Sequence, residues 1–213
     1  NVAQATSAEL AGDVRAGVEF LRSRPDLNPR AIGLLGHSEG ALIAPLVAAR
    51  SRHVAFLVLL AGPGVIGEEI LYAQGALIAR AAGVPDADIT VNQQRQRKLF
   101  EILRADSFGP GAEPQLRAAF SEILESLTPV QRLSAAMTLE SQLQMLTTPW
   151  FRHFLTYDPR VALRHVKCPV LALNGELDLQ VPFHDNLSEI RRCLHAAGHR
   201  AVTTVALPGL NHL

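Results

Sequence analysis

Hydrophobic positions along the first part of the chain alternate between helical and strand spacing. Residues 7–24 place leucines and valines three or four positions apart, which predicts an amphipathic helix with Ser7 as its candidate N-cap. A short apolar strand is expected at residues 31–36 (AIGLLG), followed by a helix at 39–50 that Pro45 kinks or begins. This order of helix, strand and helix is typical of α/β folds.

A continuous apolar run and a long all-helical region come next. Residues 53–62 (HVAFLVLLAG) are apolar throughout rather than alternating, which is typical of a parallel strand that helices cover on both faces. Helical spacing dominates from 63 to 164, and the helices are expected at 68–82, 93–104, 113–127 and 133–146. Because no comparable strand appears among them, residues 63–164 are interpreted as a helical insertion over the sheet.

Strands return near the C-terminal end of the sequence. They are expected at 168–175 (CPVLALNG) and 201–207 (AVTTVAL), with a helix at roughly 186–197 between them. Short connections between alternating strands and helices imply a doubly wound parallel sheet. Residues 1–62 and 165–213 therefore form the predicted α/β core.

Composition and charge narrow the class of partner. The 213 residues, of which 48% are apolar, suffice for one sizeable core. Twenty Lys and Arg residues balance twenty Asp and Glu residues, so no net field attracts nucleic acid or anionic lipid, and a small molecule is the expected partner. No apolar stretch approaches the ~20 residues that span a bilayer. Cys168 and Cys193 lack CxxC spacing, which favours two separate thiols over a metal or redox site.

The segment GHSEG, residues 36–40, is the first candidate for chemistry. It fits the pattern G-x-S-x-G, with a predicted strand before it and a helix after it. A serine on so sharp a turn has a strained backbone, and side chains larger than hydrogen at Gly36 and Gly40 are expected to collide as strand and helix approach each other. The following helix N-terminus adds positive potential and exposed N–H groups. The pattern predicts an exposed nucleophile at Ser38, although a plain tight turn would use the same residues.

A nucleophilic serine needs a base and a carboxylate that orients this base. Asp178 follows the third recognisable strand and His212 follows the fourth, so both belong to the carboxyl edge of the sheet, where Ser38 also lies. The order Ser, Asp, His matches one of the known orders of such triads. Ser38, Asp178 and His212 are therefore the candidate catalytic residues.

The sequence offers other carboxylates and histidines for the same roles. Glu176 lies two residues before Asp178 and is the alternative acid. His37 is expected to pack beside the turn that carries the serine, and the sequence leaves the roles of His153 and His184 open.

The turn GHSEG, the segment PVLALNGELDLQVP and the terminal GLNHL occur in this order within an alternating framework. On these motifs the chain resembles an α/β-hydrolase of the serine esterase or serine peptidase type. The resemblance implies Ser38 as nucleophile, His212 as general base and Asp178 as orienting acid, with the amide of Glu39 donating to the oxyanion. It also implies an α/β-hydrolase-type doubly wound parallel sheet in which residues 63–164 form a helical cap over the substrate.

Two further features have both a structural and a functional interpretation. The Glu39 carboxylate is favoured at a helix N-terminus by the helix dipole, or it meets a substrate amine, which would suit a peptidase. The stretch PWFRHFLTYDP, residues 149–159, concentrates aromatic side chains in a chain with only 5% aromatic residues. These side chains pack the insertion against the core, or Trp150 and Arg152 line the acyl or alcohol pocket.

The chain departs from the α/β-hydrolase pattern before the serine. Family members carry several strands there, together with the loop that supplies a second oxyanion N–H, whereas only one helix precedes Ala31 here. We therefore expect the N-terminal strands to be absent from this chain, and an upstream segment or a second chain to complete the sheet. Without that layer, residues 31–36 become an apolar edge strand, and weak activity and aggregation are expected.

Cleavage of a carboxylic ester through an acyl-enzyme is the expected reaction, and it needs no metal or organic cofactor. The substrate is expected to be a small neutral or hydrophobic ester. A serine peptidase or amidase with the same three residues is one alternative, and a non-catalytic binding protein that retains the fold is another. The presence of Ser38, Asp178 and His212 together argues against the binding protein.

Overall fold

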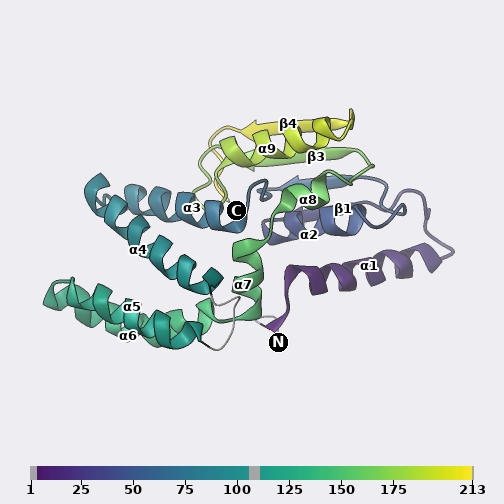
Figure 1. Cartoon of the computed structure of the whole chain (residues 1–213). Coiled ribbons are helices and arrows are strands. Elements are labelled where there is room, and N and C mark those ends of the chain that lie inside the picture. Colours follow the sequence, from purple (N-terminus) through teal and green to yellow (C-terminus); the bar gives the residue numbers. More distant parts are fainter. Residues whose placement is uncertain (1–3, 106–110, 213) are drawn as a thin grey trace.

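A parallel sheet forms the centre of the fold (Figure 1). The computed structural model describes residues 4–105 and 111–212. The sheet has the order β1-β2-β3-β4, with neighbouring strands parallel, and its strands are β1 (Leu34–His37), β2 (Leu57–Leu60), β3 (Val170–Gly175) and β4 (Val202–Leu207). All four carboxyl ends therefore meet at one edge. The predicted parallel α/β sheet is confirmed, with strands one to six residues shorter than the apolar runs that predicted them.

Four helices belong to the layer beside this sheet: α1 (Ser7–Ser23), α2 (Glu39–Ala48), α8 (Pro159–Leu163) and α9 (Phe183–Ala196). α2 packs on β1 and β2, α9 packs on β3 and β4, and α8 lies between α2 and α9. α1 packs on α2 rather than on the strands. The N-cap of α1 is Thr6, which forms a capping box with Glu9, so the expectation for Ser7 was wrong by one position.

The two faces of the sheet differ in burial. Leu57 and Leu59 are almost fully buried in the cluster that also contains residues of α2 and α9. Val58, Leu60 and other residues of the opposite parity, which point to the other face, are only half-buried, and Leu35 on β1 is 68% exposed. The apolar run 53–62 led us to expect cover on both faces, whereas the described helices that contact strands pack on one face.

The chain between β2 and β3 is helical, as predicted, and its first five helices form a segment of their own. We call this the helical segment, and it comprises α3 (Gly67–Ala81), α4 (Asp86–Ala105), α5 (Ala112–Glu125), α6 (Pro129–Leu146) and α7 (Pro149–Thr156). In Figure 1, α3 to α6 extend away from the sheet, and α7 stands between them and α1. An apolar cluster separate from the sheet core, with Phe100, Leu116 and Phe151 among its members, stabilises the segment. No described helix is long and apolar enough to cross a membrane.

Candidate active site

Ser38 lies on the turn between β1 and α2 with φ 54° and ψ −118°. A positive φ is unfavourable for a residue with a side chain, so the surrounding structure must hold this conformation. At Gly36, an added Cβ would lie 2.1 Å from the carbonyl oxygen of Gly40, so only glycine fits where strand and helix approach. The expectation for Gly40 was wrong, because a Cβ there meets no described atom within 4 Å outside its own helix and chain neighbours. The close approach thus restricts the strand side of the turn alone.

Asp178 and His212 lie together at the carboxyl edge, and both side chains are buried. Nδ1 of His212 donates a hydrogen bond to Oδ2 of Asp178 at 2.8 Å. Because a carboxylate accepts this bond, the proton of a neutral His212 lies on Nδ1, and Nε2 carries the lone pair that a general base needs. The alternative acid Glu176 is exposed.

Backbone amides and one side chain hold the Asp178 carboxylate in place. Its Oδ1 accepts from the amides of Gln180 and Val181, each at 2.8 Å, and its Oδ2 also accepts from Nδ2 of Asn174 at 3.1 Å. Asn174 is 2% exposed and belongs to β3, so a residue of the sheet itself positions the carboxylate of Asp178. Sequence reasoning missed Asn174, whose only signal was a polar residue in the apolar strand LALNG.

His37 connects the serine turn to the loop that carries His212. Its Nε2 donates to the backbone carbonyl oxygen of His212 at 2.7 Å, and the two ring centroids are 4.8 Å apart. His37 therefore packs beside the turn, as expected, and also contacts the candidate base. In the described part of the chain, no hydrogen bond joins the Ser38 hydroxyl to the His212 ring. A cavity of about 400 Å³ beside these residues is lined by the strand ends and the His212 loop.

Glu39 follows Ser38 and joins three helices. Its Oε1 accepts from the Ser7 hydroxyl of α1 at 2.6 Å and from Nε1 of Trp150 of α7 at 2.8 Å. The Trp150 ring stacks on Phe154, with ring centroids 5.6 Å apart. Trp150 thus holds the helical segment against the start of α2, and the half-buried Arg152 belongs to the same helix α7.

His153 belongs to α7 and lies near Glu39 of α2. It is one of the two histidines whose role the sequence does not decide. Burial lowers the pKa of His153, while the negative charges of Glu39 and Glu9 act in the opposite direction. Its ring centroid is 5.3 Å from that of Tyr157, and burial raises the pKa of Tyr157 to about 12. His184, the other open histidine, is exposed and pairs with Asp185. In the part of the chain that the structure describes, no group of three or more His, Cys, Asp or Glu residues could hold a metal ion.

Comparison with known proteins finds one matching family and many solved structures of similar fold. The family described as "BAAT / Acyl-CoA thioester hydrolase C terminal" matches residues 15–113, slightly less than half of the chain. No curated protein matches the sequence significantly.

Solved structures are similar over almost the whole chain at low sequence identity. DcsB, solved with a substrate analogue, has a TM-score of 0.55 at 15% identity over 98% of this chain and 66% of its own. The Pyrococcus furiosus esterase Pf2001 has a TM-score of 0.53 at 14% identity over 92% of this chain and 52% of its own. A putative dipeptidyl aminopeptidase IV from Bacteroides ovatus has a TM-score of 0.52 at 12% identity over 99% of this chain and 20% of its own.

The chain spans from a fifth to about two thirds of the length of these proteins, so it corresponds to a part of each. At such identities the likeness concerns the fold. The parallel sheet and the helices packed on it agree with this likeness. The chain has the α/β-hydrolase fold.

Proposed function

We propose that the chain is the catalytic part of a serine hydrolase in which Ser38, His212 and Asp178 form a triad that cleaves carboxylic esters. The observation that carries the proposal is the buried hydrogen bond between His212 and Asp178, at the sheet edge where Ser38 has a positive φ. Strained backbone concentrates at functional sites, and a histidine held by a buried carboxylate has the tautomer of a general base.

The geometry supports a two-step acyl transfer. His212 Nε2 accepts the proton of the Ser38 hydroxyl while Oγ attacks the ester carbonyl carbon, and the C=O electron pair moves onto the oxygen. The amide of Glu39, in the first turn of α2, donates to this oxyanion. Collapse of the intermediate expels the alcohol, which takes the proton from His212. Water then attacks the acyl-enzyme with His212 again as base, and the carboxylic acid and free Ser38 are released.

In this proposal, rotation of the Ser38 side chain brings its hydroxyl into hydrogen-bond contact with Nε2 of His212. His37 precedes Ser38 in the sequence and already contacts both the backbone and the ring of His212. Hydrogen bonds between nucleophile and base are often long or misaligned in enzymes without substrate and tighten when substrate binds.

Within residues 63–164, helices α3 to α7 act as a cap over the core formed by 1–62 and 165–213, whereas α8 at the end of this range packs in the layer beside the sheet. The bond between Trp150 and Glu39 supports this division, because it attaches α7 directly beside the nucleophile. Trp150 and Arg152 then face the acyl or alcohol side of the substrate. Glu39 already accepts two hydrogen bonds within the protein, so its contacts support a role in attaching the cap rather than in amine recognition.

We also propose that further polypeptide, from the same or a second chain, pairs with β1 and supplies the second oxyanion N–H. β1 is an edge strand among the described residues, and its Leu35 is 68% exposed. Light scattering tests this point with Leu35→Lys against Val130→Lys, because Val130 is 81% exposed but belongs to α6. Lower self-association in Leu35→Lys alone is expected, and equal association in both variants would contradict it.

Thioester cleavage is a second candidate, favoured by the family that matches residues 15–113. The same triad and oxyanion site serve both reactions, with a thiol in place of the alcohol as leaving group. Turnover of matched butyryl ester, butyryl thioester and aminoacyl amide substrates separates the candidates. We expect the ester to be cleaved fastest. Faster cleavage of the thioester or the amide would contradict the proposed substrate class, whereas the proposed triad would still stand.

Dependence on the serine completes this experiment. Ser38→Ala is expected to abolish turnover of the preferred substrate, whereas Ser141→Ala, at an exposed serine of α6, leaves it unchanged. Retained turnover in Ser38→Ala would contradict the proposal for every substrate class.

A further inference from the structure

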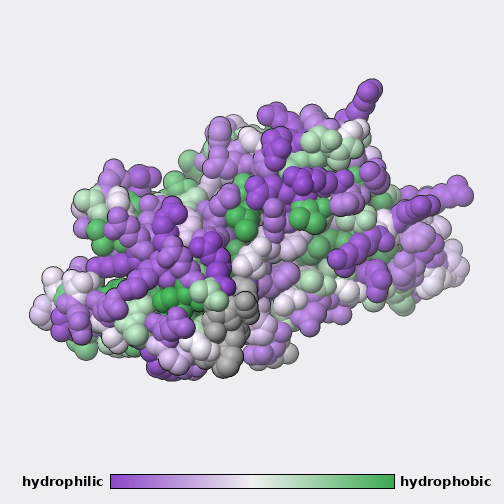
Figure 2. Space-filling model, in the orientation of Figure 1, coloured by the Kyte–Doolittle hydropathy of each residue, from purple (hydrophilic) through white to green (hydrophobic). Residues whose placement is uncertain are grey.

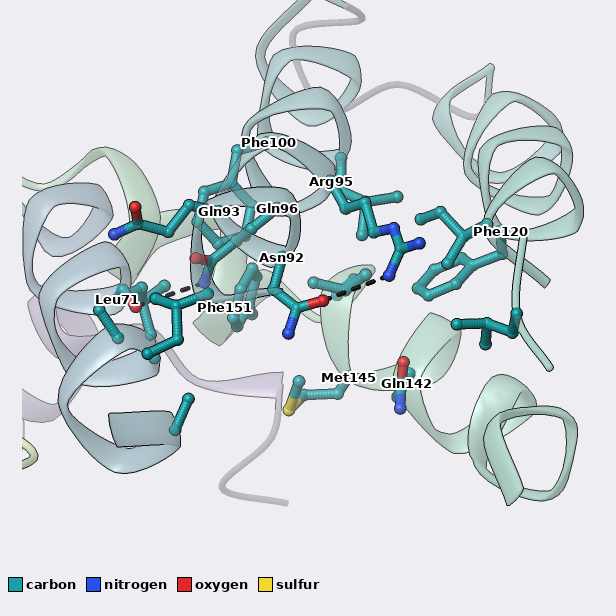
Figure 3. Close-up of a pocket in the computed structure, with 18 residues that line it drawn as sticks. Leu71, Asn92, Gln93, Arg95, Gln96, Phe100, Phe120, Gln142, Met145 and Phe151 are labelled. Carbon is teal, nitrogen blue, oxygen red and sulfur yellow. Dashed lines mark hydrogen bonds between the residues drawn. The ribbon is translucent and has the colours of Figure 1, made fainter. Parts of the chain in front are cut away.

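The helical segment contains an open cavity of about 530 Å³ among α3, α4, α5, α6 and α7 (Figure 3). This volume lies within the range of ~300–1,000 Å³ typical of small-molecule sites. Phe100, Phe120 and Phe151 belong to its lining and are buried. Figure 2 shows hydrophobic side chains in the recess where α4 meets α5 and α6, on a surface that is otherwise largely polar.

The cavity is separate from the Ser38 site. Its lining comes from the helical segment and Leu127, whereas the cavity beside His212 is lined by strand ends and the His212 loop. Among the described residues, the two linings have no member in common. A ligand in the helical segment would therefore bind independently of whether Ser38 is catalytic.

One positive charge stands at the wall of this apolar cavity. Arg95 is half-buried, and its guanidinium donates to Oδ1 of Asn92 at 3.2 Å and to the Ser126 hydroxyl at 2.8 Å (Figure 3 draws the bond to Asn92). Both acceptors are neutral. Glu122, on the neighbouring turn of α5, pairs with Lys98. The Arg95 charge is thus held in position by neutral groups, and charge-assisted hydrogen bonds to a carboxylate would be stronger than these.

Two other polar side chains of the wall are directed to the backbone. Nε2 of Gln96 donates to the Leu71 carbonyl at 3.3 Å, and Nε2 of Gln93 donates to the Tyr72 carbonyl at 3.5 Å. Met145 is 47% exposed at the wall, and its flexible thioether can adapt to a ligand chain. An apolar volume with one held guanidinium fits a molecule that has an apolar chain and a single negative end.

We propose that this cavity binds an amphipathic monocarboxylate, such as a medium-chain fatty acid, with its chain between the phenylalanines and its carboxylate on Arg95. The site is a binding site in the helical segment, additional to the esterase function proposed for Ser38.

Gly75 offers a variant that fills the cavity without disturbing the backbone. It lines the cavity from α3, and an added Cβ would meet only Oε1 of Gln96, at 3.7 Å, which is ordinary contact. Gly75→Phe therefore places a ring in the cavity and removes a helix-weakening glycine. Gly17→Phe is the matched control, because Gly17 is an exposed glycine of α1 with open space around it.

Equilibrium dialysis of the full chain with dodecanoate and with dodecanol tests the proposal. We expect the unmodified chain, Ser38→Ala and Gly17→Phe to bind dodecanoate alike, and Gly75→Phe to bind it at least about tenfold more weakly. Arg95→Gln is expected to weaken dodecanoate binding by about tenfold, the size of a charged hydrogen bond, and to leave dodecanol binding unchanged.

Each other outcome contradicts part or all of the assignment. Absence of binding to the unmodified chain, or unchanged binding to Gly75→Phe, would overturn the site. An Arg95→Gln effect on both ligands or on neither would overturn the role of Arg95. Loss of binding in Ser38→Ala would place dodecanoate at the Ser38 site instead. All of these measurements record binding rather than turnover, so they do not test the proposed triad.

Discussion

His37 donates a hydrogen bond from its Nε2 to the backbone carbonyl of His212 at 2.7 Å, although 175 positions separate the two residues. The bond joins the residue before the candidate nucleophile to the candidate base. Since a displacement of about 1 Å can cost roughly 10²-fold in rate, such a bond positions the two reacting groups. His37 is therefore a positioning residue in the proposed mechanism.

Removal of this bond should affect the chemical step. In His37→Ala we expect kcat to fall by about 10- to 100-fold with KM nearly unchanged, because His212 loses its register against Ser38. His37→Gln, whose amide can donate to the same carbonyl, should recover part of the loss. Steady-state kinetics checks both variants. Equal rates in the alanine variant and the unmodified chain would show that the bond is not needed.

The acid is tested by a pair of carboxylates two positions apart. Asp178→Asn keeps the size of the side chain but presents an amide to Nδ1 of His212, which favours the wrong tautomer. By analogy with serine proteases, kcat should fall by about 10⁴-fold. Glu176→Gln, at an exposed position, is the control and should retain full kcat. A large loss in Glu176→Gln with little in Asp178→Asn would reverse the assignment.

The serine turn makes a prediction about stability. Gly36→Ala forces a Cβ against the Gly40 carbonyl and should lower the free energy of unfolding by at least about 1–3 kcal/mol. Gly40→Ala adds a methyl group in open space within α2 and should leave stability equal or raise it by up to about 1 kcal/mol. Denaturant unfolding measures both, and similar losses in the two variants would contradict this view of the turn.

His153 makes stability depend on pH. Burial lowers its pKa in the folded chain below the value of about 6.5 expected when unfolded. The unfolded state then binds more protons, so stability should fall as pH decreases from above 6.5 toward the lowered pKa. His153→Phe, which keeps a ring against Tyr157, should lose this part of the dependence. Unfolding at pH 7.5 and 5.5 compares the variants, and identical pH dependence would argue against the effect.

Local sequence patterns predicted much of the fold because local physics determines it. Apolar runs identified all four strands, and helical spacing located α3, α5 and α6 to within a few residues. α7 was missed as a helix, since its stretch PWFRHFLT is short and was interpreted through its aromatic content. The order of Ser38, Asp178 and His212 was visible because each follows a strand at the same sheet edge.

Contacts between distant residues could not be predicted in the same way. Trp150 donates to Glu39 across 111 positions, and no local spacing encodes that pair. Asn174 lies only four positions from Asp178, but its side chain reaches the carboxylate only because the loop after β3 turns back. Gly40 looked like a steric requirement by symmetry with Gly36, whereas the backbone path makes only one of the two crowded.

Intact-mass spectrometry after treatment with a fluorophosphonate probe tests the central claim most directly. The probe reacts with a serine that a neighbouring base activates. We predict a single adduct on the unmodified chain, retained in Ser141→Ala and lost in both Ser38→Ala and His212→Ala. An adduct that persists in Ser38→Ala, or no adduct on a correctly folded chain, would contradict the proposal that Ser38 is the nucleophile of an assembled triad.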